Sequence, residues 1–308
     1  MKLSTPAALR GSKVTVISPA SYPQPEKLTK GVEALTRLGY SPWLGRHALS
    51  KAHYYFAGTT QARLEDLHAA FLDPATAAIF CSRGGYGSNY LLDGLDLGLI
   101  QEHPKPLIAH SDMTCMQTWL LDKLGLPSFH GPMVAGDFSL PEGVDETSLA
   151  SALGGERWLV GESAGLRVLK PGKANGILYG GCITLLAASL GTPYAPQTEG
   201  KLLFLEDRDV KPYQLDRLLR QFIQAGKFDG VTGIVFGEMM DCVAPGQNSG
   251  ILDEVILRVV DWFPGPIGIG LRSGHVSRRN VTLAFGIEVE LHLERIPLLS
   301  FLDRATEK

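Results

Sequence analysis

Short apolar runs alternate with amphipathic, helix-like runs through much of this 308-residue chain, and this alternation restricts the fold more than any other feature. The runs at residues 13–18, 77–82 and 106–109 are rich in apolar and β-branched residues, and helical spacing follows them. Strands that are apolar on both faces belong to parallel sheets covered by helices. The pattern therefore predicts an α/β fold, with ligand sites at the carboxyl ends of the strands.

The alternation is interrupted once, by a polar and irregular stretch from Asp137 to Gly165, and it resumes in the second half. We therefore expect an N-terminal domain at residues 1–140, an interdomain connection at 141–170 and a C-terminal domain at 171–308. The strand signal is weak at residues 168–180. The tail at residues 281–293 alternates apolar and polar residues in the manner of an antiparallel pair.

The composition is that of a water-soluble globular protein, with 44% hydrophobic and 20% charged residues and a net charge of −3. That charge offers no electrostatic basis for binding nucleic acid or an anionic membrane. Residues 1–14 lack the features of a signal peptide, and the four cysteines are far apart. We expect buried thiols, a cytoplasmic location, no cofactor and no metal site.

Ser111 stands where the apolar run at 106–109 ends and an amphipathic run begins. A serine at such a turn lies exposed at the strand's carboxyl end, beside the free amides of the helix N-terminus. This is the local geometry of a nucleophile elbow, although the glycines of G-x-S-x-G are missing. The alternative is a serine that only caps the helix. The local pattern leaves both interpretations open.

The segment at residues 83–87 reads Arg-Gly-Gly-Tyr-Gly and lies between a predicted buried strand and a helix. Glycines in such a loop let backbone amides approach an anion closely, although a tight strand-to-helix turn is the simpler explanation. The loop matches neither the P-loop nor the dinucleotide-binding motif. If it lies beside Ser111, one of its amides could complete an oxyanion hole with the amide of Asp112.

His275 and Glu206 are candidates for the other groups of a catalytic serine. His275 follows the apolar run at 267–269, and Glu206 and Asp207 close the run at 201–205. A carboxylate at a strand end can orient a histidine, and only one of these two neighbours can face it. His110 points to the opposite face from Ser111 and is a poor general base. A buried histidine and a solvated strand end are the alternatives.

Taken together, these motifs resemble one family, the LD-carboxypeptidases, which are serine peptidases. The family includes the muropeptide LD-carboxypeptidases and the microcin C self-immunity peptidases. The resemblance extends from about residue 14 to about residue 293. Its motifs are Arg-Gly-Gly-Tyr-Gly (83–87), Ser-Asp-x-Thr (111–114), His-Gly-Pro-Met (130–133), Gly-Gly-x-x-x-x-Leu (180–186), Leu-Gly-Thr-Pro-Tyr (190–194), Leu-Glu-Asp (205–207) and Gly-His-x-x-x-x-Asn-x-Thr-Leu (274–283).

The resemblance implies a catalytic triad in which Ser111 is the nucleophile, Glu206 the orienting carboxylate and His275 the general base. It also implies an N-terminal Rossmann-like domain with a parallel sheet and a smaller, β-rich C-terminal α/β domain. The site then lies between the domains, with Ser111 on the first and the other two residues on the second. Enzymes of this family are commonly homodimers, so we expect a homodimer here.

By the same resemblance, the oxyanion hole consists of the amide of Asp112 and an amide of Gly84 or Gly85. Arg83 and Tyr86 are candidates for contacting the substrate, with Arg83 holding its free carboxylate. An Arg83 that pairs within the fold is the alternative.

The implied activity is hydrolysis of an L-D amide bond, with release of terminal D-Ala from murein tetrapeptide during peptidoglycan recycling. A self-immunity peptidase that cleaves peptidyl or aminoacyl nucleotides is the second enzyme hypothesis, and there Trp158 could stack on a base. A ligand-binding module, with His275 far from Ser111, is the non-enzyme hypothesis. The chain departs from the family's usual residues at His110, Cys182, Val210 and Ala284-Phe285. These departures concern the substrate preference more than the chemistry.

Overall fold

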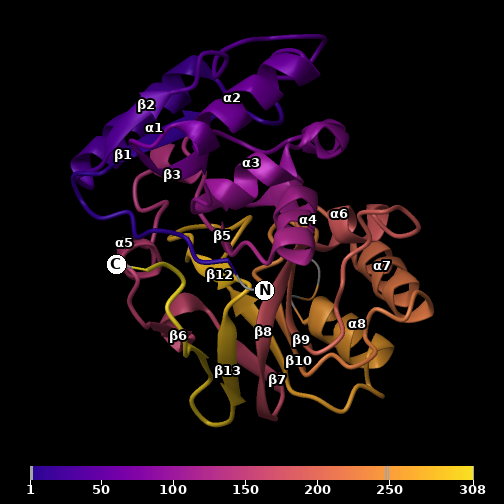
Figure 1. Cartoon of the computed structure of the whole chain (residues 1–308). Helices are drawn as coiled ribbons and strands as arrows, with labels where there is room; N and C mark the ends of the chain where they lie inside the picture. Colours follow the sequence, from indigo (N-terminus) through magenta and orange to yellow (C-terminus); the bar gives the residue numbers. More distant parts are fainter. Residues whose placement is uncertain (1–2, 247, 249, 308) are drawn as a thin grey trace.

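Two β-sheets organise the molecule. The computed structural model describes residues 3–246, 248 and 250–307, and in this part of the chain one sheet has six strands and the other eight. Figure 1 shows the N-terminal half, coloured indigo to magenta, beside the sheet formed by the C-terminal half. The predicted α/β class with a parallel N-terminal sheet is confirmed.

The first sheet has the order β12-β5-β4-β3-β1-β2, and every neighbouring pair except β12 and β5 is parallel. Its two faces bury different side chains, with α1 over one face and α2 and α4 over the other, as the apolar strands predicted. The strands are β1 (Lys13–Ile17), β2 (Ser41–Leu44), β3 (Thr76–Cys81), β4 (Leu107–Ala109), β5 (Ser128–His130) and β12 (Leu283–Phe285). The helices of this half are α1 (Pro25–Arg37), α2 (Thr60–Leu72), η1 (Ser88–Gly94), α3 (Leu97–Glu102), η2 (Ser111–Met113) and α4 (Thr114–Leu124).

The second sheet has the order β6-β14-β13-β8-β9-β10-β11-β7, with β8 to β11 parallel and the outer pairs antiparallel. Its strands are β6 (Leu159–Gly161), β7 (Arg167–Lys170), β8 (Gly172–Cys182), β9 (Lys201–Glu206), β10 (Gly233–Gly237), β11 (Ile267–Leu271), β13 (Glu288–Leu293) and β14 (Leu298–Phe301). The helices of this half are η3 (Asp137–Ser139), α5 (Glu146–Leu153), η4 (Glu162–Ala164), α6 (Ile183–Ala188), α7 (Pro212–Gln224) and α8 (Ile251–Val259). Helices α6, α7 and α8 pack on one face of this sheet.

The two halves share a continuous core. One cluster of buried side chains runs from Val14 and Phe129 in the first sheet to Phe204 and Val289 in the second. Polar contacts also join α4 to β8, since Tyr179 Oη donates to Asp122 Oδ2 over 2.8 Å. Near the carboxyl ends of β4 and β9, the Cys182 amide donates to Thr114 Oγ1 over 3.0 Å, and Cys182 pairs with Glu206 in the sheet. Among the described helices, none is both long and apolar enough to span a bilayer.

Two expectations about the second half need correction. The tail does not pair with itself, because β12 joins β5 in the first sheet while β13 lies between β8 and β14 in the second. Alternation reports which side chains are buried and does not identify the partner strand. The stretch at residues 168–180, where the strand signal is weak, forms most of β7 and of the eleven-residue strand β8. The first half of β8 is only partly buried, and its glycines interrupt the apolar pattern. The domain boundaries near residues 140 and 171 stay a prediction.

Candidate active site

Ser111 lies at a sharp turn directly after the buried strand β4. Its φ angle is 62°, in the left-handed region that residues with a side chain rarely adopt. His110, not Ser111, holds the cap position of the short helix η2. A helix cap has extended backbone and accepts from the first turn, so Ser111 does not have the geometry of a cap. A strained strand-to-helix turn with an exposed hydroxyl is the geometry of a nucleophile elbow.

The glycine loop lies against this elbow. A Cβ on Gly84 would lie 2.8 Å from Ser111 Cβ, 3.0 Å from Ser111 Oγ and 3.2 Å from the Asp112 nitrogen. Gly85 is turned toward Ser21, since a Cβ there would lie 2.4 Å from Ser21 Oγ. Only a residue without a side chain allows the loop backbone to come this close to Ser111. The loop and the Asp112 amide are thus neighbours of the Ser111 hydroxyl.

Buried polar contacts hold the loop in this position. Asp112 Oδ2 accepts a hydrogen bond from the Ser88 amide over 2.7 Å, and Ser88 Oγ donates to the Asp112 carbonyl over 2.5 Å. The guanidinium of Arg63, which is 1% exposed, donates to the Gly87 carbonyl over 2.7 Å. These contacts hold the glycine loop and the elbow in a fixed relative position without the help of a ligand.

Glu206 and His275 are joined directly, although 69 positions separate them. Glu206 ends β9, and its Oε2 accepts from His275 Nδ1 over 2.8 Å and from the His275 amide over 3.0 Å. Asp207 faces the other way and accepts from the Thr184 amide over 2.9 Å and its hydroxyl over 2.6 Å. The expectation that only one of the two carboxylates can face the histidine is confirmed, and Glu206 is that residue.

The electrostatics of this pair suit a base and its orienting carboxylate. Burial lowers the pKa of His275, but the charge of Glu206 and its hydrogen bond outweigh burial and raise that pKa above its usual 6.5. For Glu206, burial favours the neutral form, yet the charge of His275, the nearby His130 ring and the His275 hydrogen bond hold its pKa well below the usual range. A buried anionic carboxylate therefore faces an imidazole that accepts a proton readily.

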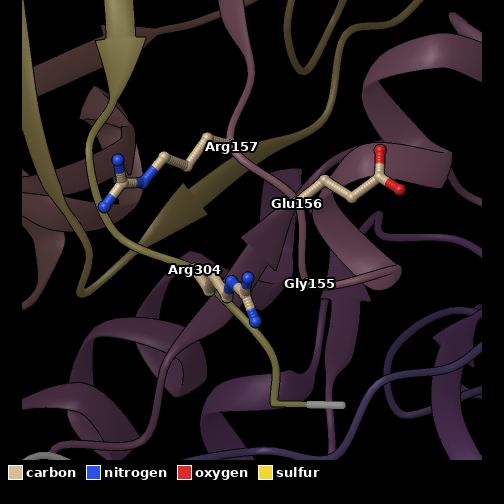
Figure 2. Close-up of a pocket in the computed structure, with 4 residues that line it drawn as sticks. All are labelled: Gly155, Glu156, Arg157 and Arg304. Carbon is tan, nitrogen blue, oxygen red and sulfur yellow. The ribbon is translucent and has the colours of Figure 1, made fainter.

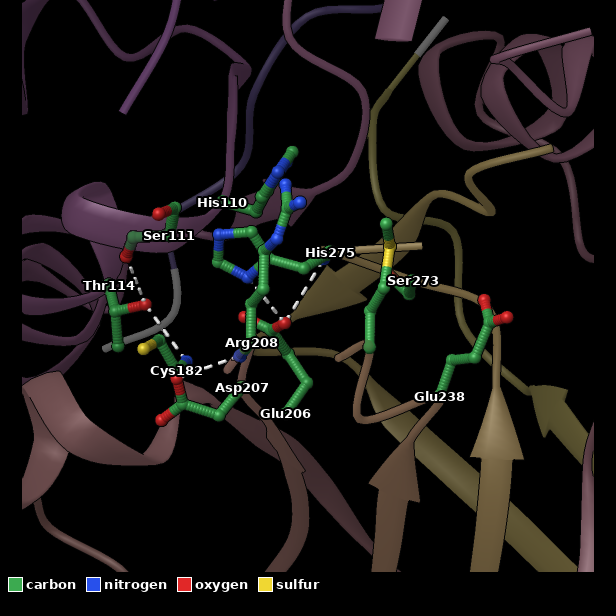
Figure 3. Close-up of polar contacts among 12 residues, drawn as sticks. His110, Ser111, Thr114, Cys182, Glu206, Asp207, Arg208, Glu238, Ser273 and His275 are labelled. Carbon is green, nitrogen blue, oxygen red and sulfur yellow. Dashed lines mark hydrogen bonds and ion pairs between the residues drawn. The ribbon is translucent and has the colours of Figure 1, made fainter. Parts of the chain in front are cut away.

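The imidazole of His275 lies between Glu206 and Ser111, as Figure 3 shows. Since Nδ1 is occupied by Glu206, Nε2 is the nitrogen left to face the serine. In the described part of the chain no hydrogen bond joins the Ser111 hydroxyl to this ring; such contacts are often long without substrate. His110 packs edge-on against His275 with ring centroids 5.2 Å apart, and its Nδ1 contacts the Gly131 carbonyl over 2.8 Å. Burial lowers the pKa of His110 to about 3, so His110 remains neutral near pH 7.

Gly274 provides the space in which Glu206 is held. Its φ angle is 91°, and a Cβ there would lie 2.7 Å from Glu206 Cδ and 2.7 Å from His130 Cε1. The Asn280 side chain fixes this residue by accepting from the Gly274 amide over 3.1 Å and donating to its carbonyl over 2.9 Å. Because the contacts are with buried side chains on two strands, neither can move away cheaply.

We predict that Gly274→Ala lowers the free energy of unfolding by about 2 to 4 kcal/mol, from overpacking together with the left-handed backbone. The matched control is Gly191→Ala, because Gly191 has a φ of 80° and nothing within 4 Å of its would-be Cβ. That control bears only the backbone cost of about 1 kcal/mol. Denaturant unfolding of both variants measures the difference, and equal losses would contradict tight packing at Glu206.

Of the remaining predicted residues, Arg83 and Tyr86 belong to the glycine loop, whereas Trp158 directly precedes β6, the edge strand of the second sheet. Arg83 Nη1 donates to the Tyr22 carbonyl over 3.3 Å from an exposed position, so part of the side chain pairs within the fold. Tyr86 is 42% exposed and packs against Tyr55, with ring centroids 5.6 Å apart. Trp158 is stacked on Phe301 with ring centroids 3.9 Å apart.

Sequence reasoning missed two residues that surround Glu206, namely His130 and Ser273. The ring of His130 is fully buried, its Nδ1 is 2.9 Å from Ser273 Oγ, and its Nε2 is 3.8 Å from Glu206 Oε1. The available signal was positional, because His130 opens the His-Gly-Pro-Met motif and Ser273 directly precedes Gly274. Neither residue has a local pattern that points to a carboxylate 67 or more positions away in the chain.

A separate cavity of about 520 Å³ is lined by Gly155, Glu156, Arg157 and Arg304 (Figure 2), and none of these is a predicted site residue. Among the described residues, no group of three or more histidine, cysteine, aspartate or glutamate side chains is arranged to hold a metal ion.

Comparison with known proteins gives a consistent result. The chain matches the LD-carboxypeptidase N-terminal domain over residues 14–131 and the LD-carboxypeptidase C-terminal domain over residues 175–291. It is 38% identical to a probable murein peptide carboxypeptidase of Bacillus subtilis, over 88% of this chain and 86% of the relative. It is 37% identical to the murein tetrapeptide carboxypeptidase of Pseudomonas aeruginosa, over 85% and 88%. The crystal structure of an MccF-like protein from Bacillus anthracis superimposes with a TM-score of 0.88 at 25% identity, covering 98% of this chain and 100% of that one.

Proposed function

The chain belongs to the LD-carboxypeptidase family, and from this premise we propose that it is a serine carboxypeptidase that releases terminal D-Ala from murein tetrapeptide. The single observation that supports the mechanism most strongly is the Glu206–His275 hydrogen bond of 2.8 Å beside the strained Ser111. A binding module that used Ser111 only as a helix cap would need neither feature. The names of the Bacillus subtilis and Pseudomonas aeruginosa relatives support murein peptides as the substrate class.

In the proposed reaction, Ser111 Oγ attacks the carbonyl carbon of the L-D amide while His275 Nε2 takes the hydroxyl proton. Glu206 holds Nδ1–H and stabilises the imidazolium that forms. The amide of Asp112 and an amide of Gly84 or Gly85 bind the oxyanion. The tetrahedral intermediate then collapses: the C–N bond breaks, and the imidazolium gives its proton to the departing amine of D-Ala.

Water completes the cycle by attacking the acyl-enzyme, again with His275 as the base, and this returns the Ser111 hydroxyl and the shortened peptide. We further propose that Arg83 and Tyr86, two exposed residues of the glycine loop, contact the substrate. The Arg83 guanidinium suits the free carboxylate of a terminal D-residue, because a guanidinium can bind a carboxylate through two parallel hydrogen bonds.

The deciding experiment incubates the enzyme with murein tetrapeptide and with the matched peptide that ends in L-Ala. We expect free D-Ala from the first peptide and no release from the second. Chiral chromatography of the released amino acid provides the measurement, and Ser111→Ala protein serves as the blank. Equal hydrolysis of both peptides, or none of either, would contradict the proposed function.

A self-immunity peptidase is the second candidate, favoured by the likeness to the MccF-like structure. The same three residues would cleave an aminoacyl-sulfamoyl adenosine. Trp158 does not support base stacking, because its ring already packs against Phe301. A side-by-side assay of tetrapeptide and aminoacyl-sulfamoyl adenosine separates the candidates by their relative kcat/KM.

We also propose that the enzyme works in the cytoplasm as a homodimer, as the family resemblance implies. All four cysteines are buried free thiols, which fits a reducing compartment. Sedimentation equilibrium of the purified chain measures its oligomeric state directly.

A further inference from the structure

The carboxylate of Glu206 has two oxygens in unlike surroundings. Oε2 accepts both hydrogen bonds from His275, whereas Oε1 has no hydrogen-bond partner. Glu206 is 0% exposed, so water does not provide the missing donor at the surface. An anionic oxygen buried without a donor is costly, so a polar neighbour close to Oε1 matters for its stability.

That neighbour is His130 on β5. Its Nε2 lies 3.8 Å from Glu206 Oε1, and Nε2 itself has no hydrogen-bond partner. Two buried polar atoms without partners thus face each other across a distance slightly longer than a hydrogen bond. Phe204 and Phe285 pack against the imidazole, each with a ring centroid 5.2 Å away, and they restrict its tilt.

The buried charge of Glu206 selects the tautomer of His130, and Ser273 can accommodate that tautomer. Its Oγ is 2.9 Å from His130 Nδ1 and 3.3 Å from the His130 carbonyl. The hydroxyl has one proton, which it can donate to Nδ1 over the shorter contact. The ring N–H then resides on Nε2 and points at the carboxylate. The opposite tautomer would direct a lone pair at a buried anion, which is repulsive.

We propose that His130 is a positioning residue that holds Oε1 of Glu206 through its Nε2–H, so that Oε2 remains on His275. The role deepens the proposed function and rests on it. Without His130, the carboxylate is free to rotate about its last bond, and the imidazole of His275 loses its fixed orientation toward Ser111. Gly274 is part of the same arrangement, because any side chain there would separate His130 from Glu206.

Two amide replacements separate this role from simple packing. His130→Gln places an amide N–H near the position of Nε2 and retains a donor for Glu206. His130→Asn places its amide near Nδ1, beside Ser273, and leaves Oε1 without a donor. Both variants bury one amide of similar polarity, so thermal unfolding provides the check that their stabilities are comparable.

We expect His130→Gln to keep kcat within about fivefold and His130→Asn to lower it by roughly 100-fold, the scale of a misplaced catalytic group. In a Glu206→Gln background, His130→Asn should cause no further loss, because its effect passes through Glu206. The same fractional loss in both backgrounds, or equal losses for Gln and Asn, would overturn the proposal.

A titration gives an answer that does not depend on turnover. NMR of the His275 ring measures its pKa in the wild-type protein and in His130→Asn. We expect a lower value in the variant, because a displaced carboxylate stabilises the imidazolium less. The groups that also act on His275 are His110, Asp137 and Asp207, and they are unchanged in the comparison. An unchanged pKa overturns the inference, whereas a wild-type enzyme inactive on tetrapeptide overturns only the proposed function.

Discussion

Ser111→Ala is expected to remove turnover of murein tetrapeptide, with kcat falling by about a millionfold, while the protein remains folded. In the proposed mechanism, the Ser111 hydroxyl forms the acyl-enzyme. Ser111 is partly exposed, so removal of its hydroxyl leaves no fully buried polar group unpaired. A D-Ala release assay gives the rate, and circular dichroism checks the fold.

Ser111→Gly provides the matched control for this result. Glycine adopts a φ of 62° without strain, so the variant should be more stable than Ser111→Ala by about 1 kcal/mol and equally inactive. Activity and stability then move independently, and loss of turnover cannot be attributed to unfolding. Near-normal hydrolysis by either variant would exclude Ser111 as the nucleophile.

Glu206→Gln is expected to lower kcat by about ten thousandfold, the effect of neutralising the carboxylate of a catalytic triad. With His275 as the proposed base, we expect the wild-type enzyme to lose activity as the pH falls through the raised pKa of His275, because the protonated ring cannot accept the serine proton. The acid limb of its kcat/KM profile therefore lies above pH 6.5. With the charge of Glu206 removed, this pKa falls and the limb moves to lower pH.

Asp207→Asn is the control for that prediction. Asp207 neighbours Glu206 in the chain, but its carboxylate accepts from Thr184 and does not touch His275. We expect a much smaller loss of kcat and a smaller displacement of the acid limb, because Asp207 acts on His275 only through its charge at a distance. Equal behaviour of the two variants would contradict a specific role for Glu206.

Much of the fold could be predicted because local signals agreed with the tertiary structure. Thr59 caps α2 and Pro212 is the first residue of α7, and these residue types are preferred at those positions. The pairing of the tail could not be predicted in this way. An alternating strand shows which face is buried, but β12 and β13 find their partners in different sheets, and that choice depends on the whole assembly.

The same distinction between local and long-range features applies to the site. The strand-to-helix turn at Ser111 and the glycine loop are local features, and they could be recognised from neighbouring residues. The 62° φ of Ser111 could not, since the cap and elbow interpretations share one sequence pattern. The proposed role of His130 could not be predicted either, because its partner Ser273 is 143 positions away in the chain.

The sequence alone therefore determined the alternating strands and helices, the strand-to-helix turn at Ser111 and the ordered motifs of the family, because each depends on residues close together in the chain. The tertiary structure alone decided that Glu206 rather than Asp207 faces His275, and that His130 and Ser273 surround the same carboxylate. The physical reason is that contacts between distant segments depend on sheet order and register, which no local pattern encodes.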